Sequence, residues 1–237
     1  MSGALAGYKK RGIVYVTGSL SCPYASQSYP LGVALARAGY SLMTGGGPGV
    51  AKEAARGFTS VPKEERKGRS IAVTWGPAGG YRVPGYPNEY CEVSVGLNLP
   101  RDKVGDHAVT SRNHANEADV CVAFPGDSMT RRDIELCVGY EHPVVVHPSW
   151  SDCCPSLWDF RDVEDCMAVV HGVMRDRGRR PNVHKLKVAN VLRGRTAEDL
   201  RAEESKRTLE KGEENEFFYK ELEKLEQRRL LDQPQGR

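Results

Sequence analysis

The chain has 237 residues, 39% of them hydrophobic, which is enough for one α/β domain of ordinary size and an appendage. Its net charge of +3 indicates no particular class of partner, and no run of about 18 apolar residues predicts a membrane span. Seven cysteines without a CxxC pair, and an N-terminus without a secretory apolar core, lead us to expect a cytoplasmic protein with reduced thiols and no zinc motif.

The first part of the chain predicts strands that alternate with helices. β-rich runs that end in turn signals cover residues 12–19, 40–45 and 70–75, and helical patterns cover residues 27–40 and 48–58. Gly39 is expected to end the first of these helices, and Gly57 the second. This alternation predicts a parallel sheet with right-handed crossovers.

The later part of the chain continues the same pattern after an irregular segment. Residues 76–91 are rich in Gly, Pro and Tyr, and we expect them to form an exposed loop or lid at an active site. The elements predicted after it are a strand at 92–99, a helix at 101–119, a strand at 120–126, a helix at 128–140 and a buried strand at 142–148. The whole predicts a Rossmann-like, doubly wound α/β domain over residues 1–175.

Beyond this domain the composition changes. Residues 176–195 are predicted to be a basic connector, with nucleic-acid binding as the alternative to a solvated segment. Residues 196–237 are predicted to be a charged C-terminal helix, in which Phe218, Leu222 and Leu225 form one apolar stripe.

The stretch TGGGPGV follows the second predicted strand. Ligands of parallel sheets lie beyond the carboxyl ends of the strands, where helix N-termini offer unpaired N–H groups that favour phosphate. Gly45, Gly46, Gly47 and Gly49 would let backbone approach an anion closely. The spacing matches neither G-x-G-x-x-G nor the P-loop, so the run favours phosphate or nucleotide contact over a dinucleotide fold or an ATPase. The alternative is a tight strand–helix turn without a ligand.

A second turn of this kind occurs in the stretch FPGDSMTRRDIE. Thr130 can cap the predicted helix or bind a phosphate. Asp133 and Glu135 are either catalytic acids or side chains that complement the helix dipole. Arg112 is a candidate for bidentate phosphate binding, and Thr17 and Ser19 could complete a set of hydroxyl groups at the switch point of the sheet.

These stretches resemble the Lonely Guy (LOG) family of nucleotide-binding proteins over about residues 12–150. The wider superfamily, often called lysine decarboxylase-like, includes molybdenum-cofactor carrier proteins. The first family motif, G-G-G-x-G-[LV]-M, matches residues 45–50, with Ala51 where Met is usual. Arg112 matches the family's arginine but lies about two residues nearer to the second motif than expected.

The second family motif, P-G-G-x-G-T-x-x-E, matches only in part. The matching positions are Pro125, Gly126 and Thr130. Asp127 and Met129 stand at glycine positions, and Asp133 stands where the family has its catalytic Glu.

The resemblance implies a phosphoribohydrolase that cleaves the N-glycosidic bond of a nucleoside 5′-monophosphate and works as a homodimer. We expect no cofactor, and we expect no metal because the six histidines show no ligand spacing. Arg112 would then hold the substrate, and Asp133 or Glu135 would act as acid/base or electrostatic stabiliser. The residues that would bind the phosphate or nucleotide are Gly18, Ser19, Gly45, Gly46, Gly47, Gly49, Pro125, Gly126, Asp127 and Thr130.

The departures from the second motif favour an alternative. Asp in place of Glu loses about 1.5 Å of reach, and a misplacement of about 1 Å can cost about 100-fold in rate. Asp127 also adds a negative charge where a phosphate would bind. The alternatives are therefore a non-catalytic nucleotide or cofactor carrier, or a scaffold that works through its C-terminal helix.

The irregular segment at residues 76–91 adds one further prediction. Its residues Tyr81, Tyr86 and Tyr90 could stack on a base.

Overall fold

The computed structural model describes residues 12–76, 85–98, 107–140, 142–150 and 158–175. Its strands form one seven-stranded sheet in the order β4-β3-β2-β1-β5-β6-β7, and every pair is parallel. The strands are β1 (Ile13–Thr17), β2 (Ser41–Thr44), β3 (Ser70–Gly76), β4 (Val93–Asn98), β5 (Val120–Ala123), β6 (Val144–Val146) and β7 (Trp158–Asp159). The chain divides into the units Met1–Arg193 and Gly194–Arg237, and all described residues belong to the first.

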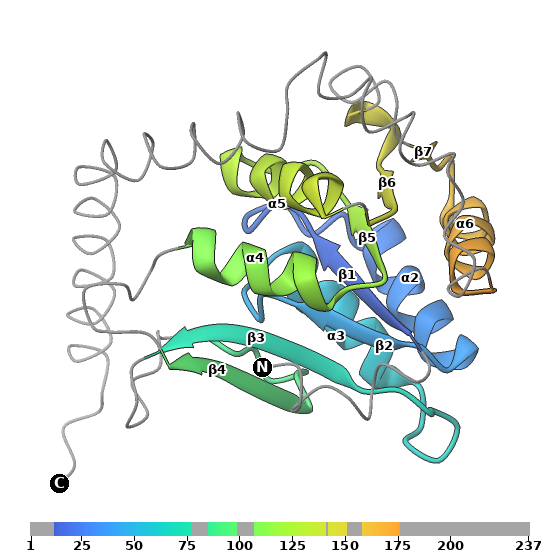
Figure 1. The fold of residues 1–237 in the computed structure, drawn as a ribbon. Coiled ribbons are helices and arrows are strands. Elements are labelled where there is room, and N and C mark those ends of the chain that lie inside the picture. The colour runs from blue at the N-terminus through green and yellow to red at the C-terminus, as the bar shows by residue number, and fades with distance from the viewer. Residues whose placement is uncertain (1–11, 77–84, 99–106, 141, 151–157, 176–237) are drawn as a thin grey trace, which may run out of the picture. The chain divides into compact units, whose positions relative to one another are not determined.

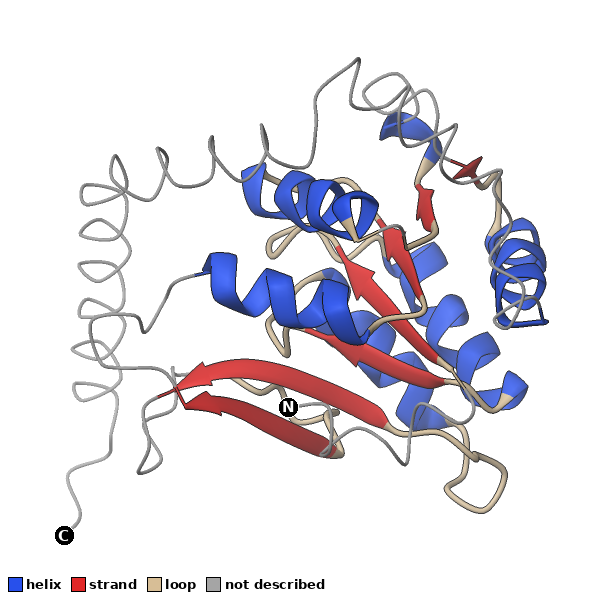
Figure 2. Cartoon of the chain, viewed as in Figure 1, coloured by secondary structure: helices blue, strands red, loops and turns tan. Residues whose placement is uncertain are grey.

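Helices cover both faces of the sheet (Figures 1 and 2). They are α2 (Ala25–Ala38), α3 (Val50–Ser60), α4 (His107–Glu117), α5 (Ser128–Gly139) and α6 (Val163–Arg175), with a short 3-10 turn at Pro148–Trp150. One core cluster joins α2, α3 and α6 to one face of the sheet, and a second joins α4 and α5 to the other. None of these helices is long and apolar enough to cross a bilayer.

Strand β1 lies in the middle of the sheet and is buried along its whole length. Because side chains alternate along a strand, Val14 and Val16 enter one core cluster while Ile13 and Tyr15 enter the other. A strand covered on both faces is expected to be apolar throughout. Tyr15 and Thr17 are the exceptions, and the hydroxyl groups of both reach the site described below.

Helices α2 and α3 approach each other closely at two glycines. A Cβ at Gly32 would overlap the carbonyl oxygen of Ala54, and a Cβ at Gly57 would overlap that of Tyr29. The prediction that Gly57 ends its helix is therefore wrong. The helix runs on to Ser60, and Gly57 is small because a neighbouring backbone lies against it.

The predicted fold class, a Rossmann-like α/β domain, is confirmed. Each strand and helix predicted between residues 12 and 148 is present with bounds shifted by a few residues, and Gly39 ends α2 in a left-handed conformation as expected. The sequence analysis assigned no element to β7 or to α6, although α6 buries Cys166, Met167 and Val170 in the core. The predicted connector at 176–195 and the predicted helix at 196–237 lie outside the described residues, as does Tyr81.

Candidate functional site

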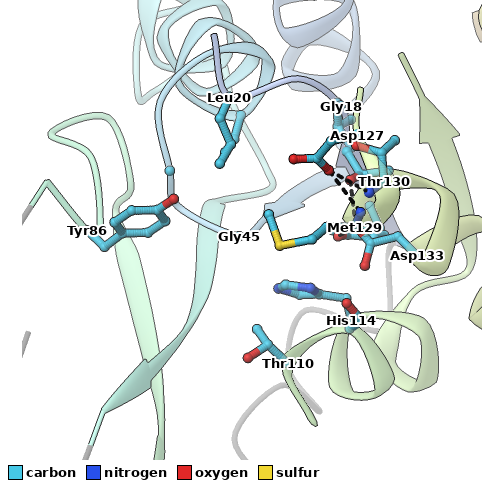
Figure 3. A pocket seen from close by; sticks show the side chains of 16 residues that line it. Gly18, Leu20, Gly45, Tyr86, Thr110, His114, Asp127, Met129, Thr130 and Asp133 are labelled. Carbon is cyan, nitrogen blue, oxygen red and sulfur yellow. Dashed lines mark hydrogen bonds between the residues drawn. The ribbon is translucent and has the colours of Figure 1, made fainter. Parts of the chain in front are cut away.

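A cavity lies at the carboxyl ends of β1, β2 and β5, where the sheet order turns from β2 on one side of β1 to β5 on the other (Figure 3). This switch point is where open α/β sheets bind their ligands. The cavity volume is about 80 Å³, room for several water molecules or one small polar group. The lining residues are Tyr15, Val16, Thr17, Gly18, Leu20, Gly45, Gly47, Ala51, Tyr86, Thr110, Ser111, His114, Asp127, Met129, Thr130 and Asp133.

Asp133 is the acidic group at the floor of this cavity. It lies on α5, is 6% exposed, and accepts hydrogen bonds at Oδ2 from the Tyr15 hydroxyl (2.7 Å) and the Thr17 hydroxyl (2.6 Å). Its other oxygen, Oδ1, has no hydrogen-bond partner among the described residues. Burial, and then the adjacent Asp133 carboxylate, raise the pKa of Tyr15 well above its usual value, so the phenol stays a donor. One carboxylate oxygen is thus held by two hydrogen bonds, and the other is buried without a hydrogen-bond partner in the described part of the chain.

His114 lies beside this group on α4 and is 3% exposed. Its ring stacks on Tyr15 with centroids 4.5 Å apart, and Nε2 lies 3.2 Å from the Val73 carbonyl oxygen. Burial lowers the pKa of His114 more than the Asp133 carboxylate and the nearby backbone carbonyls raise it, so the ring is neutral at neutral pH. Because a carbonyl only accepts, Nε2 carries the proton, and Nδ1 is an acceptor without a hydrogen-bond partner in the described part of the chain.

The glycine run is explained largely by contacts within the chain. Gly46 and Gly49 have positive φ angles of 74° and 65°, which side chains with a Cβ rarely adopt. A Cβ at Gly49 would overlap the Ser19 carbonyl oxygen, and a Cβ at Gly47 would lie 2.6 Å from the Tyr86 hydroxyl. The tight-turn alternative therefore accounts for three of the four glycines.

Gly45 differs from the other three glycines. It lines the cavity, its φ is not positive, and a Cβ there would meet only His114 Cε1, at 3.8 Å. The turn itself is held from a distant loop, since the Asn88 side-chain amide donates to the carbonyl oxygens of Gly46 (3.1 Å) and Gly47 (3.0 Å). Gly45 is thus the member of the run whose small size leaves space for a ligand.

The start of α5 is capped by Asp127. Its Oδ1 accepts from the backbone N–H groups of Met129 (2.9 Å) and Thr130 (3.4 Å), which are donors that a phosphate at this helix would need (Figure 3). The cap is therefore Asp127 and not Thr130, whose side chain is buried against Gly126. Met129 also lines the cavity, and its side chain lies between Leu20 and His114 in this view.

The structure separates the two candidate acids. Asp133 lines the cavity, whereas Glu135 is not among the lining residues and pairs with Arg131 at 3.3 Å on the surface of α5. The backbone of Arg112 lies in α4, and its side chain lies outside the described part of the structure.

The other predicted ligand-binding residues fall in two groups. Gly18, Gly45, Gly47, Asp127 and Thr130 line the cavity, and Ser19, Gly46, Gly49, Pro125 and Gly126 do not. Ser19 instead binds the backbone N–H groups of Ser21 and Cys22 in a local turn.

The tyrosines of the predicted loop also differ from one another. Tyr86 lines the cavity, and burial, with a smaller effect of Asp127, raises its pKa to about 12. Tyr90 packs against the core and lies near Lys52, whose Nζ is 5.9 Å from the ring centroid.

Among the described residues no group of three His, Cys, Asp or Glu side chains could hold a metal ion.

The sequence analysis missed three residues that shape the site. Tyr15 and His114 were not proposed as site residues, because one lies inside an apolar strand and the other in a helix of weak periodicity. Met129 was noted only as a departure from a glycine position. The position of Tyr15 two residues before Thr17 was an available signal, because side chains at i and i+2 of a strand lie on the same face.

Fold and cavity together define a Rossmann-like α/β protein with a small cavity at its switch point. No protein-family model matches the sequence, and no curated protein matches it either. Solved structures do share its fold, each matching about two thirds of this chain and nearly all of its own. The X-ray structure of TM1055, a structural-genomics target, superposes with a TM-score of 0.54 at 20% identity over 68% of this chain and 99% of its own.

Two further structures of the same fold are named for a cofactor. The molybdenum cofactor binding protein from Rippkaea orientalis has a TM-score of 0.52 at 17% identity, over 68% of this chain and 95% of its own. The molybdenum cofactor carrier protein from Chlamydomonas reinhardtii has a TM-score of 0.52 at 21% identity, over 69% of this chain and 98% of its own. The resemblance inferred from the motifs, which includes such carriers, is thereby confirmed at the level of the fold.

Proposed function

We propose that this protein binds a small molecule of nucleoside or nucleotide type in the switch-point cavity and holds it without cleaving it. The observation that carries the proposal is Asp133: a carboxylate with 6% exposure in the lining of the cavity, fixed at Oδ2 by Tyr15 and Thr17, whose buried Oδ1 has no hydrogen-bond partner among the described residues. A buried acceptor left without a partner is costly, and a ligand that satisfies it regains that free energy. The fold shared with molybdenum cofactor carrier and binding proteins supports the same role.

Two features favour binding over hydrolysis. Asp127 occupies N–H groups of α5 that would hold a substrate phosphate, and Met129 takes up space beside them. In addition, Asp133 is one methylene shorter than the Glu of the family motif, and both of its hydroxyl partners hold it against β1.

The second candidate function is N-glycosidic cleavage of a nucleoside 5′-monophosphate. It is favoured by the placement of Asp133, which reaches the cavity at the motif position of the catalytic acid. A carboxylate there could stabilise the positive charge that develops on the sugar during bond cleavage. Arg112 would be its substrate-binding partner.

The test is calorimetry of the full chain with adenosine, guanosine, cytidine, uridine and their 5′-monophosphates, followed by chromatography of each mixture for free base. We expect at least one compound to bind, and Asp133→Ala to abolish that binding. Asp162→Asn is a matched control, because Asp162 caps α6 through the Asp165 N–H and does not line the cavity. Release of free base that Asp133→Ala abolishes would establish the hydrolase instead.

Pairing of two copies remains a prediction from the family resemblance. Light scattering of the full chain at micromolar concentration tests it, and a monomeric mass would contradict it.

A further inference from the structure

The described side chains of the cavity carry negative charge and no positive charge. Asp127 and Asp133 are two carboxylates among the lining residues, and no Lys or Arg occurs among the lining residues whose side chains the structure describes. His114, the remaining titratable base of the lining, is kept neutral by burial. A phosphate that entered this part of the cavity would meet two like charges.

Two backbone donors at the start of α5 are already used. The N–H groups of Met129 and Thr130 donate to Asp127 Oδ1, so the start of α5 offers a ligand a carboxylate where a glycine would leave open amides. The Met129 side chain lies in the cavity beside them. On the opposite wall, Gly47 is covered by Tyr86.

The buried polar atoms of the lining that lack a hydrogen-bond partner among the described residues are mainly acceptors. Asp133 Oδ1 and His114 Nδ1 are both acceptors, and neither has a hydrogen-bond partner among the described residues. The hydroxyl of Thr110, which can donate or accept, is also without one there. All three residues line the cavity, and two acceptors and a hydroxyl suit a ligand that brings donors of its own.

We propose that the part of the ligand that enters this cavity is uncharged and rich in hydrogen-bond donors, as the hydroxyl and amino groups of a nucleoside are, and that no phosphate binds at the start of α5. The inference rests on the proposed function and narrows its ligand from nucleotides to nucleosides or compounds with similar donors. Asp133 is the primary acceptor, and Asp127 is the residue that discriminates against phosphate.

The experiment compares each of the four nucleosides with its own 5′-monophosphate by calorimetry of the full chain. We expect each nucleoside that binds to do so at least about tenfold more tightly than its monophosphate, because of repulsion by Asp127 at a partly screened distance. Asp127→Asn keeps an acceptor for the Met129 and Thr130 N–H groups but removes the charge. This variant is expected to bind monophosphates more tightly, so that the preference for a nucleoside over its monophosphate falls at least about threefold. Asp162→Asn, which removes the charge of a different helix cap, is expected to leave the preference unchanged.

The outcomes separate this inference from the proposed function. A monophosphate that binds as tightly as its nucleoside, or an unchanged preference in Asp127→Asn, overturns the inference and leaves the proposed function standing. Failure of all eight compounds to bind at millimolar concentration refutes the proposed function, and the inference with it. Circular dichroism of each variant confirms that a lost signal reflects binding and not unfolding.

Discussion

Replacing Gly49 and Gly45 separately by alanine tests whether the glycine run is required by the fold or by a ligand. Gly49 has φ 65° and ψ −131°, a region that costs a residue with a Cβ about 1–3 kcal/mol. The new Cβ would also overlap the Ser19 carbonyl oxygen, and such overpacking costs about 1–3 kcal/mol more. Gly49→Ala should therefore lower the free energy of unfolding by about 2–6 kcal/mol, a large part of the 5–15 kcal/mol typical of a domain.

Gly45→Ala is the matched comparison within the same turn. Its nearest described neighbour, His114 Cε1, would lie 3.8 Å from the new methyl group, an ordinary contact distance, and its φ is not positive. The unfolded chain would lose conformational freedom worth about 0.4–1 kcal/mol, so stability should stay the same or rise slightly. Ligand binding should nevertheless weaken, since the methyl group enters the cavity that Gly45 lines.

Urea denaturation of both full-length variants, followed by far-ultraviolet circular dichroism, gives the two free energies from midpoints at a shared slope. Thermal scans should agree, with Gly49→Ala melting about 4–24 °C lower at about 2–4 °C per kcal/mol for a chain of this size. Equal losses in the two variants, or a larger loss in Gly45→Ala, would refute the assignment of Gly49 to the fold and Gly45 to the site.

Three further predictions concern the helices around the site. Gly57→Ala should gain about 1 kcal/mol of stability through helix propensity but lose about 1–3 kcal/mol through overlap with the Tyr29 carbonyl oxygen. The urea midpoint should therefore fall, and a rise would mean that α2 and α3 can move apart without cost. Asp127→Ala should cost about 1 kcal/mol of stability through the lost cap, whereas Asp127→Asn should keep most of it; equal losses would contradict the capping role. The folded-state pKa of His114 is lowered, so the unfolded chain binds the proton more readily and stability should fall as the pH drops below about 6.5. His114→Gln should make this fall shallower between pH 7 and 5.5 in urea titrations at stepped pH, and an unchanged slope would assign it to other groups.

The fold could be predicted because local sequence patterns indicate its strands and helices. Strand and helix periodicities, together with glycines such as Gly39, mark where elements begin and end. Two elements were not predicted. β7 has only two residues, too few for any alternation. The start of α6 did carry a signal, because Asp162 is a capping residue and Glu164 and Asp165 lie in the first turn.

Apart from Tyr86, the predicted residues that line the cavity lie in the two motifs and at the end of the first strand. Asp133 was identified by its place in a motif, but its choice over Glu135 needed the structure, because two residues of separation turn side chains to different sides of a helix. The sequence shows the run of glycines, but it does not show which contacts require glycine there. Tyr86 and Asn88, which press on the turn and hold it, come about forty residues later in the chain. Contacts between residues so far apart in the chain cannot be predicted from a local sequence pattern.

The cap at the start of α5 also bears on how this protein would respond to its chemical surroundings. With glycine at position 127, the Met129 and Thr130 amides would be left to water or to a bound anion, and unfolding would become harder as the anion concentration rose. Asp127 supplies that partner from within the chain at all times. The start of α5 is thereby stabilised without a bound anion, and we expect the midpoint of urea unfolding to stay the same when phosphate is added at constant ionic strength.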